Sequence, residues 1–475
     1  MTAAELIKQQ PEEIIATLEA QRPKDYKNNI SNYKAQLDPC QHDIVVNKID
    51  RKDRYRRVVH IDADGVRRES TEIDRVNRIA LPLQQIIIER AVAFLFGNDV
   101  KVTAIGDDEA LAQAVTDAFM GIGKDNKLDS FNRKLARSTF SVAESAEYWY
   151  IPEGKNVMHN RYGFNTKSRF RCQLFSPLKG DYLYPYFDDY GDMTAFGREF
   201  TIKDDRGNDL RSFELWTDNK YCRWVNDGGW VPQEERENKL GAIPIVYYSQ
   251  ENPEYYGVQI LIERVEKLLS NTGDTNDRHA RPILAAKGRV ENMIGDFVQL
   301  DEGADVHYVS WDQGTSSVRE EIEVLLNLIY SLSQTPNISF ESVKGVGNLS
   351  GVSLKMLFLD AHLKVRNKQE LFEEGLIRRY NILKRFLAQI NPAWGEKVNH
   401  LEVDIKITPY IVGNETETID NITTLYSSKQ ISLQRALELS PYVDNPDIEL
   451  QRIKDEAAER EESAEGLDDA MNEEE

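Results

Sequence analysis

Cysteine is scarce in this chain, and no stretch of it stays hydrophobic for long. The 475 residues include 3 cysteines, Cys40, Cys172 and Cys222, which are widely spaced. They provide neither a disulfide framework nor the spacing of a metal site, so a reducing cytoplasm during synthesis is the simplest expectation. The longest wholly apolar run, Ala91–Phe96, is far shorter than the roughly 20 residues that cross a bilayer, and no membrane partner is expected. Residues 1–20 are polar and amphipathic and lack the apolar core of a signal peptide.

The sequence also lacks the residue patterns of common catalytic and metal sites. Its 7 histidines are scattered, without the close pairs that bind zinc, and no Gly-x-Ser-x-Gly or Cys–His signature is present. The glycines of 345–347 and Gly351 superficially resemble a phosphate-binding loop, but no strand precedes them and no Lys-Ser or Lys-Thr follows them. The aspartate pairs 188–189 and 204–205 could hold a divalent cation, although turn chemistry explains such pairs in most cases. We therefore expect no cofactor, no metal and no enzymatic activity.

Negative charge is concentrated at the C-terminal end. The net charge is −21, and the last thirty-five residues contain 14 acidic and 3 basic side chains, a net charge of −11. The first eighty residues are nearly neutral, with 15 basic and 14 acidic side chains. Tight nucleic-acid binding comes mostly from neutralising phosphates, so an acidic protein is a poor binder of DNA. The charge balance therefore argues against tight binding of nucleic acid.

The length of the chain predicts two or more domains, and its 40% hydrophobic and 29% charged residues are ordinary for a soluble protein. Residues 1–44 are predicted to form a helical arm with a loose joint at 21–24. Alternating residues at 44–46 and 57–61, with turn chemistry at 62–65, predict a hairpin.

A cluster of basic residues lies beside this hairpin: Arg51, Lys52, Arg54, Arg56 and Arg57. A solvated hairpin tip is the more ordinary interpretation of such a cluster. Contact with a capsid or with nucleic acid is the alternative.

Three helices are then predicted, over 71–97, 107–121 and 128–143, with Gly97 ending the first. Residues 146–248 are rich in aromatic and β-branched residues and contain Asp/Gly turns at 189–191, 204–207 and 226–229. This pattern predicts an antiparallel β module packed on the preceding helices.

From about residue 253 to 390 the pattern reads helix, short β module, helix, glycine-bearing loop and very long helix. Pro253 suits a first helical turn, and Ser317–Glu320 fits a capping box that would begin the second helix. The segment 282–311 between the helices is short and strand-like, and the glycine-bearing loop is 342–351. The apolar faces of the two helices comprise Val258, Leu261, Ile262, Val265, Leu268 and Leu269 in the first, and Val318, Ile322, Leu325, Leu326, Ile329 and Leu332 in the second.

Basic residues are frequent along the long helix. They favour either salt bridges between subunits or a solvated outer face, which is the commoner case. Gly375 is a candidate bend. The basic positions are Lys355, Lys364, Arg366, Lys368, Arg378, Arg379, Lys384 and Arg385.

The last part of the chain predicts a strand over 401–411 and helices over 416–429, 432–439 and 445–464. From Gly466 onward the sequence is acidic and is predicted to be disordered.

The order of these segments resembles the portal proteins of tailed bacteriophages, in particular the group typified by the portal of the Bacillus phage SPP1. The resemblance covers roughly residues 45–457 and depends on order and pattern. The matching stretches are Asn77–Gly97, Leu240–Tyr248, Ala285–Gly288, Ser350–Lys355 and Tyr442–Lys454.

The resemblance implies an α+β subunit with an α/β wing, a two-helix stem that carries a small β clip, a tunnel loop, a long helix and a helical crown. The implied boundaries are an arm at 1–44, the wing at 45–252, stem helices at 253–280 and 314–335, the clip at 281–313, the tunnel loop at 336–350, the long helix at 351–391, the crown at 392–457 and the acidic tail at 458–475.

The resemblance also implies a function without enzymatic activity. Twelve copies would form a ring at one vertex of the phage head, and double-stranded DNA would enter and leave through its channel. The implied partners are the terminase large subunit, head–tail connector or adaptor proteins, and major capsid and scaffold proteins. Assembly would take place in the cytoplasm of the bacterial host, and the finished ring would belong to the virion.

The tunnel loop is the implied DNA-facing site, and its residues are Lys344, Gly345, Val346, Gly347 and Asn348. Glycines widen the accessible backbone conformations, and Lys344 is the only cation between Gln334 and Ser353. A lone lysine makes a weak, salt-screened contact with phosphate, which suits moving DNA. An ordinary connector between helices remains the alternative for this loop.

Two other classes of protein stay open at this point. The first is a non-portal structural ring adaptor of a phage particle, which ring order and contact with terminase would distinguish. The second is a nucleic-acid-modifying enzyme, which would turn over nucleotide or cut DNA.

Overall fold

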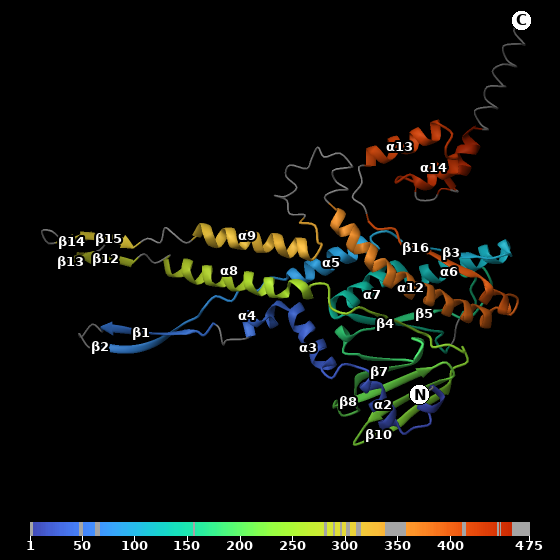
Figure 1. Cartoon of the computed structure of the whole chain (residues 1–475), viewed down its shortest axis with the longest axis horizontal. Coiled ribbons are helices and arrows are strands. Elements are labelled where there is room, and N and C mark those ends of the chain that lie inside the picture. The colour runs from blue at the N-terminus through green and yellow to red at the C-terminus, as the bar shows by residue number, and fades with distance from the viewer. Residues whose placement is uncertain are drawn as a thin grey trace, which may run out of the picture. The chain divides into compact units, whose positions relative to one another are not determined.

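A computed structural model gives the fold (Figure 1). It describes residues 3–46, 51–61, 67–154, 157–279, 283–287, 290–294, 297–300, 305–309, 315–337, 358–410, 415–443, 446 and 448–457. The chain divides into two compact units: Met1–Asn337 with Asp360–Tyr410, and Ile338–Leu359 with Ile411–Glu475. Helices and antiparallel sheets both occur in the first unit, which confirms the predicted α+β class.

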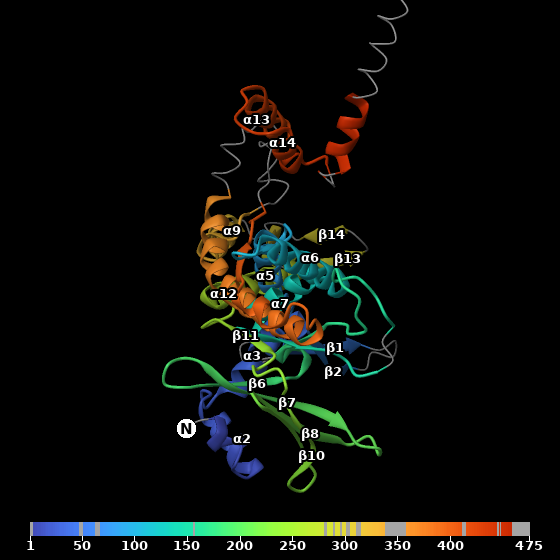
Figure 2. The ribbon, with the colours of Figure 1, turned by 90° about the vertical axis from the view of Figure 1, so that its right-hand side faces the viewer.

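The N-terminal helices cover one face of a five-stranded sheet. They are α1 (Ala3–Leu6), α2 (Pro11–Ala20) and α3 (Tyr26–Leu37). Apolar side chains of these helices, Leu18 among them, share a buried core with Phe213 and Trp224 of the sheet, and Figure 2 shows α2 lying against it. In spatial order the strands are β10 (Trp230–Glu237), β9 (Lys220–Asn226), β8 (Asp209–Thr217), β7 (Met193–Lys203) and β6 (Tyr182–Phe187).

The predicted loose joint at residues 21–24 is wrong. Arg22 is largely buried and donates hydrogen bonds to Glu144 and, over 3.2 Å, to Tyr247 Oη. Its guanidinium also lies 4.0 Å from the ring centre of Tyr26. Because the guanidinium of Arg22 is paired with the carboxylate of Glu144, the chain is held in place here.

A three-stranded sheet lies next in the unit, in the order β11 (Ile245–Ser249), β4 (Glu144–Tyr150) and β5 (Arg171–Phe175). Side chains of this sheet and of the five-stranded sheet share a second core. Trp216 and Phe196 of the five-stranded sheet belong to it. The three predicted Asp/Gly turns are confirmed, because they join β6 to β7, β7 to β8 and β9 to β10.

Four helices and a small β pair complete the centre of this unit. The helices are α5 (Leu83–Phe96), α6 (Glu109–Asn126), α7 (Leu128–Val142) and α12 (Leu359–Ile390), and they confirm the helices predicted over 107–121 and 128–143. The strand predicted at 401–411 is the shorter β16 (Glu402–Lys406), which pairs with β3 (Lys101–Ile105).

Several basic residues of α12 point inward, contrary to both interpretations of the sequence. Arg379 is fully buried and donates to Glu147 of β4 over 2.6 Å and to Asn132 of α7 over 2.8 Å. Lys384 is also buried, and its ammonium donates to the carbonyl of Leu401. Burial is the largest single influence and lowers the pKa of Arg379, but the charge and hydrogen bond of Glu147 together with the neighbouring Tyr248 and Tyr380 leave this pKa raised. These side chains therefore bind α12 to its own subunit.

The predicted hairpin is confirmed as an antiparallel pair of β1 (Arg54–Ile61) and β2 (Arg67–Asp74). The turn predicted at 62–65 lies outside the described residues. Two details of that prediction are wrong. Residues 44–46 belong to the short helix α4 (Asp43–Val46), and the helix predicted from residue 71 begins at Leu83. The residues between β2 and α5 are extended because α8 holds their backbone, as described below.

An antiparallel helix pair, α8 (Gln259–His279) and α9 (Thr315–Leu332), extends from the body of the unit. Figure 1 shows two small β pairs at its far end: β12 (Ile283–Lys287) with β15 (Asp305–Val309), and β13 (Val290–Ile294) with β14 (Phe297–Leu300).

The predicted beginnings of both helices are wrong. Pro253 lies in a turn that accepts a hydrogen bond from Tyr256, before a 3-10 turn at Tyr256–Val258 that leads into α8. Ser317 lies inside α9 and therefore does not cap it.

The second unit contains α13 (Glu415–Ser427) and α14 (Leu433–Leu439). Ser432 caps α14, because its hydroxyl accepts a hydrogen bond from the amide of Arg435 at 3.2 Å. Residues 448–457 are also helical. The helices predicted over 416–429 and 432–439 are thus confirmed.

Gly375 lies in the uninterrupted helix α12, where the sequence suggested a bend. A Cβ atom at this position would overlap with the ring of Tyr248. That ring stacks on Phe372, with 5.4 Å between ring centres. Glycine is needed here because the helix packs directly on the face of a buried aromatic ring.

Substitution of Gly375 by alanine should destabilise the protein. The added methyl group forces Tyr248 out of a packed site, which costs about 1–3 kcal/mol and exceeds the roughly 1 kcal/mol that alanine gains in a helix. Gly257→Ala is the matched control, because nothing lies within 4 Å of a Cβ there. The midpoint of urea unfolding should fall for Gly375→Ala and stay near wild type for Gly257→Ala.

Candidate functional site

The helix pair is held together by apolar packing and one ion pair. Ile262 and Val265 of α8 and Ile329 of α9 are buried. Arg264 Nη2 lies 2.7 Å from Glu321 Oε1 across the pair. Both of these side chains are half exposed, so packing supplies most of the stabilisation and the ion pair little.

A polar row along α8 binds the backbone of the extended segment 75–82. Glu266 accepts from the amide of Leu81 at 2.8 Å, and Ser270 accepts from Ile79 at 2.8 Å. Asp274 accepts from the amide of Asn77 at 2.7 Å. Every second residue of an extended segment faces the same way, and every fourth residue of a helix lies on one face. Successive bonds therefore repeat along both elements.

Arg51 closes the end of this polar row. It is buried, and it donates to Asp274, to Asn271, to the carbonyl of Ser270 over 3.2 Å and to the carbonyl of Asn77 over 3.1 Å. Arg51 is thus a structural residue, and the sequence-based grouping of it with a solvated basic cluster is wrong. Arg54 and Arg57 of that cluster are exposed on β1.

The other end of the row is a buried histidine–glutamate pair. His42 Nδ1 lies 2.7 Å from Glu266 Oε1, and His42 Nε2 lies 2.9 Å from the carbonyl of Gln36. Burial alone would lower the pKa of His42, but the hydrogen bond and the charge of Glu266 raise it. His42, with a polar partner at each ring nitrogen, thus links the end of α3 to α8.

A second buried cluster lies beside the ends of the segment 338–357. Lys364 of α12 donates to the carbonyl of Ser333 over 2.9 Å, just beyond the end of α9. Its ammonium lies 2.8 Å from Glu254 Oε2, and that of Lys368 lies 2.6 Å from Glu254 Oε1. Lys364 and Glu254 are both more than nine-tenths buried. We call Glu254, Lys364, Lys368 and Ser333 the anchor cluster.

Arg90 of α5 fixes the same chain end from the other side. It donates to the carbonyl of Pro336, and its guanidinium lies 5.4 Å from the ring centre of Tyr330. The amide of Thr335 donates to the carbonyl of Tyr330 at 2.9 Å. The last described residues before the segment 338–357 are therefore tied to two helices.

Charge compensation in the anchor cluster is strong. Burial is the largest single influence and raises the pKa of Glu254, but the charges and hydrogen bonds of Lys364 and Lys368 together leave this pKa lowered. Burial is the largest influence on Lys364 and lowers its pKa, while Glu254 opposes that change. One carboxylate thus compensates two ammonium groups in a poorly solvated place.

The predicted DNA-facing residues Lys344, Gly345, Val346, Gly347 and Asn348 lie outside the described residues. The anchor cluster was missed because its members are far apart in sequence. The available signal was Lys364 near the beginning of the long helix, in a row with the apolar Ala361 and Val365. A lysine in such a row needs a buried partner.

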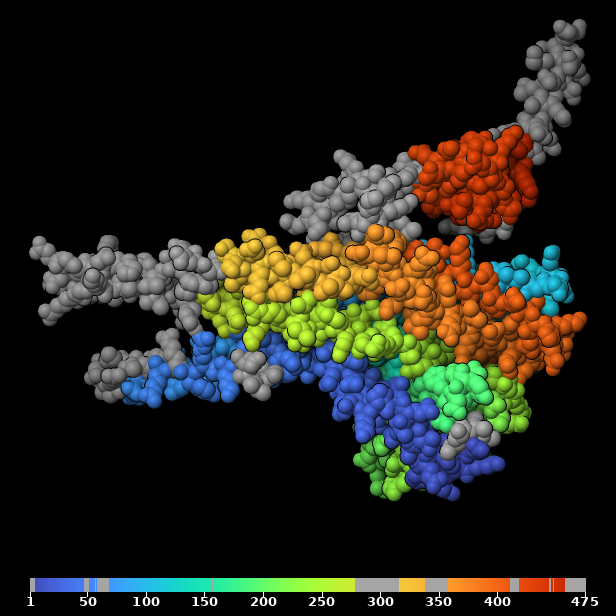
Figure 3. Space-filling view, viewed as in Figure 1, coloured from blue at the N-terminus to red at the C-terminus, as the bar shows by residue number. Residues whose placement is uncertain are grey.

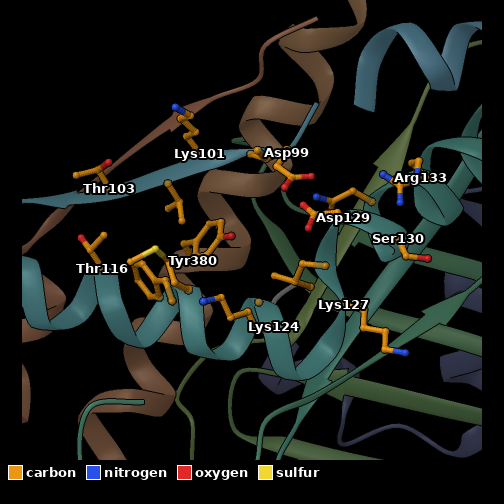
Figure 4. A pocket seen from close by; sticks show the side chains of 17 residues that line it. Asp99, Lys101, Thr103, Thr116, Lys124, Lys127, Asp129, Ser130, Arg133 and Tyr380 are labelled. Atoms are coloured by element: carbon orange, nitrogen blue, oxygen red, sulfur yellow. The ribbon is translucent and has the colours of Figure 1, made fainter. Parts of the chain in front are cut away.

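A groove of about 790 Å³ opens between α6, α7, β3 and α12 (Figure 4). Its lining mixes the carboxylates of Asp99 and Asp129 with the cations of Lys101, Lys124 and Arg133. Burial and the neighbouring Asp99 raise the pKa of Asp129, against the effect of Arg133. This mixed charge favours no single ligand class.

The candidate cation pairs at 188–189 and 204–205 are turns. Asp188 Oδ1 accepts from the amide of Asp192 at 2.9 Å, and Asp204 Oδ1 accepts from the amide of Asn208 at 2.7 Å. Among the residues that the structure describes, no three His, Cys, Asp or Glu side chains are grouped so that they could hold a metal. The described helices also include none with the length and apolarity to cross a bilayer.

The described residues thus form a mixed helix and sheet body from which a braced helix pair holds out small strand pairs, with a buried ion cluster between α9 and α12. The family model for phage portal proteins of the SPP1 Gp6-like type matches residues 12–463, and the chain belongs to this family. Membership gives it a portal role in a phage particle, which is a structural role.

A comparison with curated proteins finds no match. Among solved structures, a chain described as "Neck of empty GTA particle computed with C6 symmetry" is similar at 10% sequence identity and a TM-score of 0.33. The match covers 78% of this chain and 88% of that chain.

Replacement of Glu254 by glutamine should destabilise the protein strongly. The substitution leaves the buried ammonium group of Lys364 and the partly exposed one of Lys368 without a counter-charge, and removing one partner of a buried pair costs about 3–5 kcal/mol. Glu321→Gln, which removes the half-exposed pair with Arg264, is the matched control and should cost about 0–1 kcal/mol. Urea unfolding at pH 7 measures both.

The pH dependence of unfolding, compared between wild type and Glu254→Gln, tests the same cluster. Because the pKa of Glu254 is lowered in the folded state, its stabilisation is complete above the unfolded pKa and is lost as the pH falls through the folded pKa. The difference in the free energy of unfolding between wild type and Glu254→Gln should stay constant from pH 7 to about 5 and shrink below about 4.3. A difference that shrinks between pH 7 and 5 would contradict this assignment.

Proposed function

We propose that this protein forms the ring-shaped channel at one vertex of a phage head, through which double-stranded DNA is packaged and later ejected. Twelve copies make up the ring. The observation that supports this most directly is the helix pair α8 and α9 with small strand pairs at its tip, in a chain of the portal family. The ring belongs to the virion and assembles in the cytoplasm of the host.

In this proposal α8 and α9 are the stem, within 253–280 and 314–335, and residues 281–313 are the clip. The terminase large subunit docks on the clip during packaging, and head–tail connector proteins replace it afterwards. Major capsid and scaffold proteins contact the wing, residues 45–252. The polar row on α8 supports this role, because a docking tip transmits force only if its helices are braced against the body of the subunit.

The tunnel loop, residues 336–350, contacts the DNA in this proposal. Its support is the anchor cluster, which fixes α9 and α12 to each other where the segment 338–357 leaves and rejoins them. Lys344 makes a weak contact with phosphate, and acidic walls keep friction low, in line with the net charge of −21. The long helix, 351–391, leads into the crown, 392–457, and the acidic tail, 458–475.

Family membership favours this proposal over the two other classes of protein. A non-portal ring adaptor would share a helical stem without matching the portal family along most of its length. An enzyme acting on nucleic acid would need a catalytic constellation, and the family to which the chain belongs is structural.

Negative-stain electron microscopy of the purified full chain, viewed down the particle axis, tests the ring. We expect closed rings with a central channel wide enough for duplex DNA. A well-defined small oligomer without a channel would overturn the portal proposal and favour the adaptor.

The tunnel loop has a separate test. Gly345→Leu with Gly347→Leu should slow DNA packaging several-fold in an assay with the phage's own terminase and procapsids, because bulky side chains narrow the path and restrict the backbone. The alanine pair at the same positions is the control for size and should package faster than the leucine pair. Packaging by the leucine variant at the wild-type rate, with rings intact, would refute the proposed contact of the tunnel loop with DNA.

A further inference from the structure

The outer face of α9 carries a row of exposed apolar side chains. Val324, Leu328 and Leu332 recur every four residues and so lie on one face of the helix. Their side chains are exposed to 51%, 42% and 63%. Leu363 of α12 is also exposed and follows this row, because the neighbouring Lys364 is bonded to Ser333. We call Val324, Leu328, Leu332 and Leu363 the α9 stripe; Figure 3 shows α9 and the beginning of α12 as one continuous surface.

The hairpin of β1 and β2 offers a second apolar surface. Tyr55 and Ile73 are paired across the two strands, so their side chains lie on the same face of the ribbon. They are exposed to 75% and 58%. An isolated two-stranded ribbon is only marginally stable in water. A contact that covers this pair would stabilise the ribbon.

The elements that carry the two surfaces, α9 and the β1–β2 hairpin, lie on opposite sides of α8, as Figure 1 shows. A ring of identical subunits needs head-to-tail contacts, in which one surface of each copy meets a different surface of the next. Surfaces on opposite sides of the same helix satisfy this requirement. A single exposed patch would instead favour a two-fold dimer.

Charged side chains of both signs border the two surfaces. On the hairpin, Arg54 and Arg57 lie near Tyr55, and Glu72 and Asp74 flank Ile73. On α9, the exposed Glu320 and Glu323 precede Val324, and Glu323 is paired with Arg319 over 2.9 Å. A polar border of this kind around an apolar centre is typical of a protein–protein interface.

We propose that the α9 stripe of one subunit packs against Tyr55 and Ile73 of the neighbouring subunit, and that this contact closes the ring at the level of the helix pair. The occupant of the stripe is therefore a second copy of this chain. This inference rests on the proposed ring and names the surfaces that form it.

Cross-linking of mixed single-cysteine variants tests the contact. Leu328→Cys and Ile73→Cys are made separately in a Cys40→Ser background, which removes the exposed native thiol. Burial raises the pKa of Cys172 to about 12 and that of Cys222 to about 11, so these thiols react slowly. The two variants are assembled together and treated with a short bis-maleimide, to which each thiol adds across one maleimide double bond.

We expect covalent dimers in the mixture and none in either variant alone, because a head-to-tail contact never brings two copies of the same residue together. Val231→Cys, exposed on β10, replaces Ile73→Cys in the control mixture and should give no dimer. Dimers from Leu328→Cys alone would show a two-fold contact and overturn the proposal.

Charge substitutions provide a second, independent measurement. Leu328→Glu and Tyr55→Glu should each shift native mass spectra from rings to smaller species, and Val231→Glu should not. Rings that persist in both glutamate variants would overturn this interface and leave the proposed ring intact. The same conclusion would follow if the mixed cysteine variants formed rings of wild-type size but gave no cross-link. Failure of the wild-type chain to form rings would instead overturn the proposed function.

Discussion

A buried carboxylate needs a basic partner, and this need for pairing determines how most elements of the first unit pack together. Glu144, Glu147, Glu254 and Glu266 are each largely or fully buried, and each meets a basic side chain from a distant part of the sequence. Leaving any of these charges alone in a poorly solvated place would be costly. The pairs therefore decide where α12 lies on the three-stranded sheet and where α3 meets α8. Apolar packing supplies the bulk of the stability, and the ion pairs select one arrangement among those that packing alone would permit.

The structure separates rigid parts from projecting parts. Aromatic cores and buried ion pairs join the two sheets to α7 and α12, and the polar row on α8 joins this body to the helix pair. What projects from it, namely the outer face of α9 and the β1–β2 hairpin, bears exposed apolar side chains. Such a division suits a subunit that is stable by itself but completes its surface only in an assembly.

Local signals in the sequence predicted local structure well. The Asp/Gly turns, α6 and α7 follow from residue type and spacing alone, and so does the order of helix, strands and helix around residues 253–335. The errors lie where distant residues decide. The sequence predicted a helix over residues 75–82. Their backbone amides instead donate hydrogen bonds to side chains of α8, which lies nearly two hundred positions later. The lysines and arginines of α12 read as solvated because Glu147 and Glu254 precede it by more than a hundred residues. The sequence suggested a bend at Gly375, because the ring that requires a glycine there, Tyr248, lies far away in the sequence.

The bonds of the polar row join two elements whose repeat lengths differ slightly, so they can coincide only over a short distance. Four residues of helix advance by about 6.0 Å, whereas two residues of extended chain advance by roughly 6.6 Å. Each further bond therefore adds a mismatch of about 0.6 Å. The amides of Leu81, Ile79 and Asn77 pair directly with Glu266, Ser270 and Asp274, and the side chain of the same Asn77 reaches Asp277, about one turn further along α8. The two repeats therefore match over three successive amide bonds, and a single residue inserted into either element would misalign every bond beyond it.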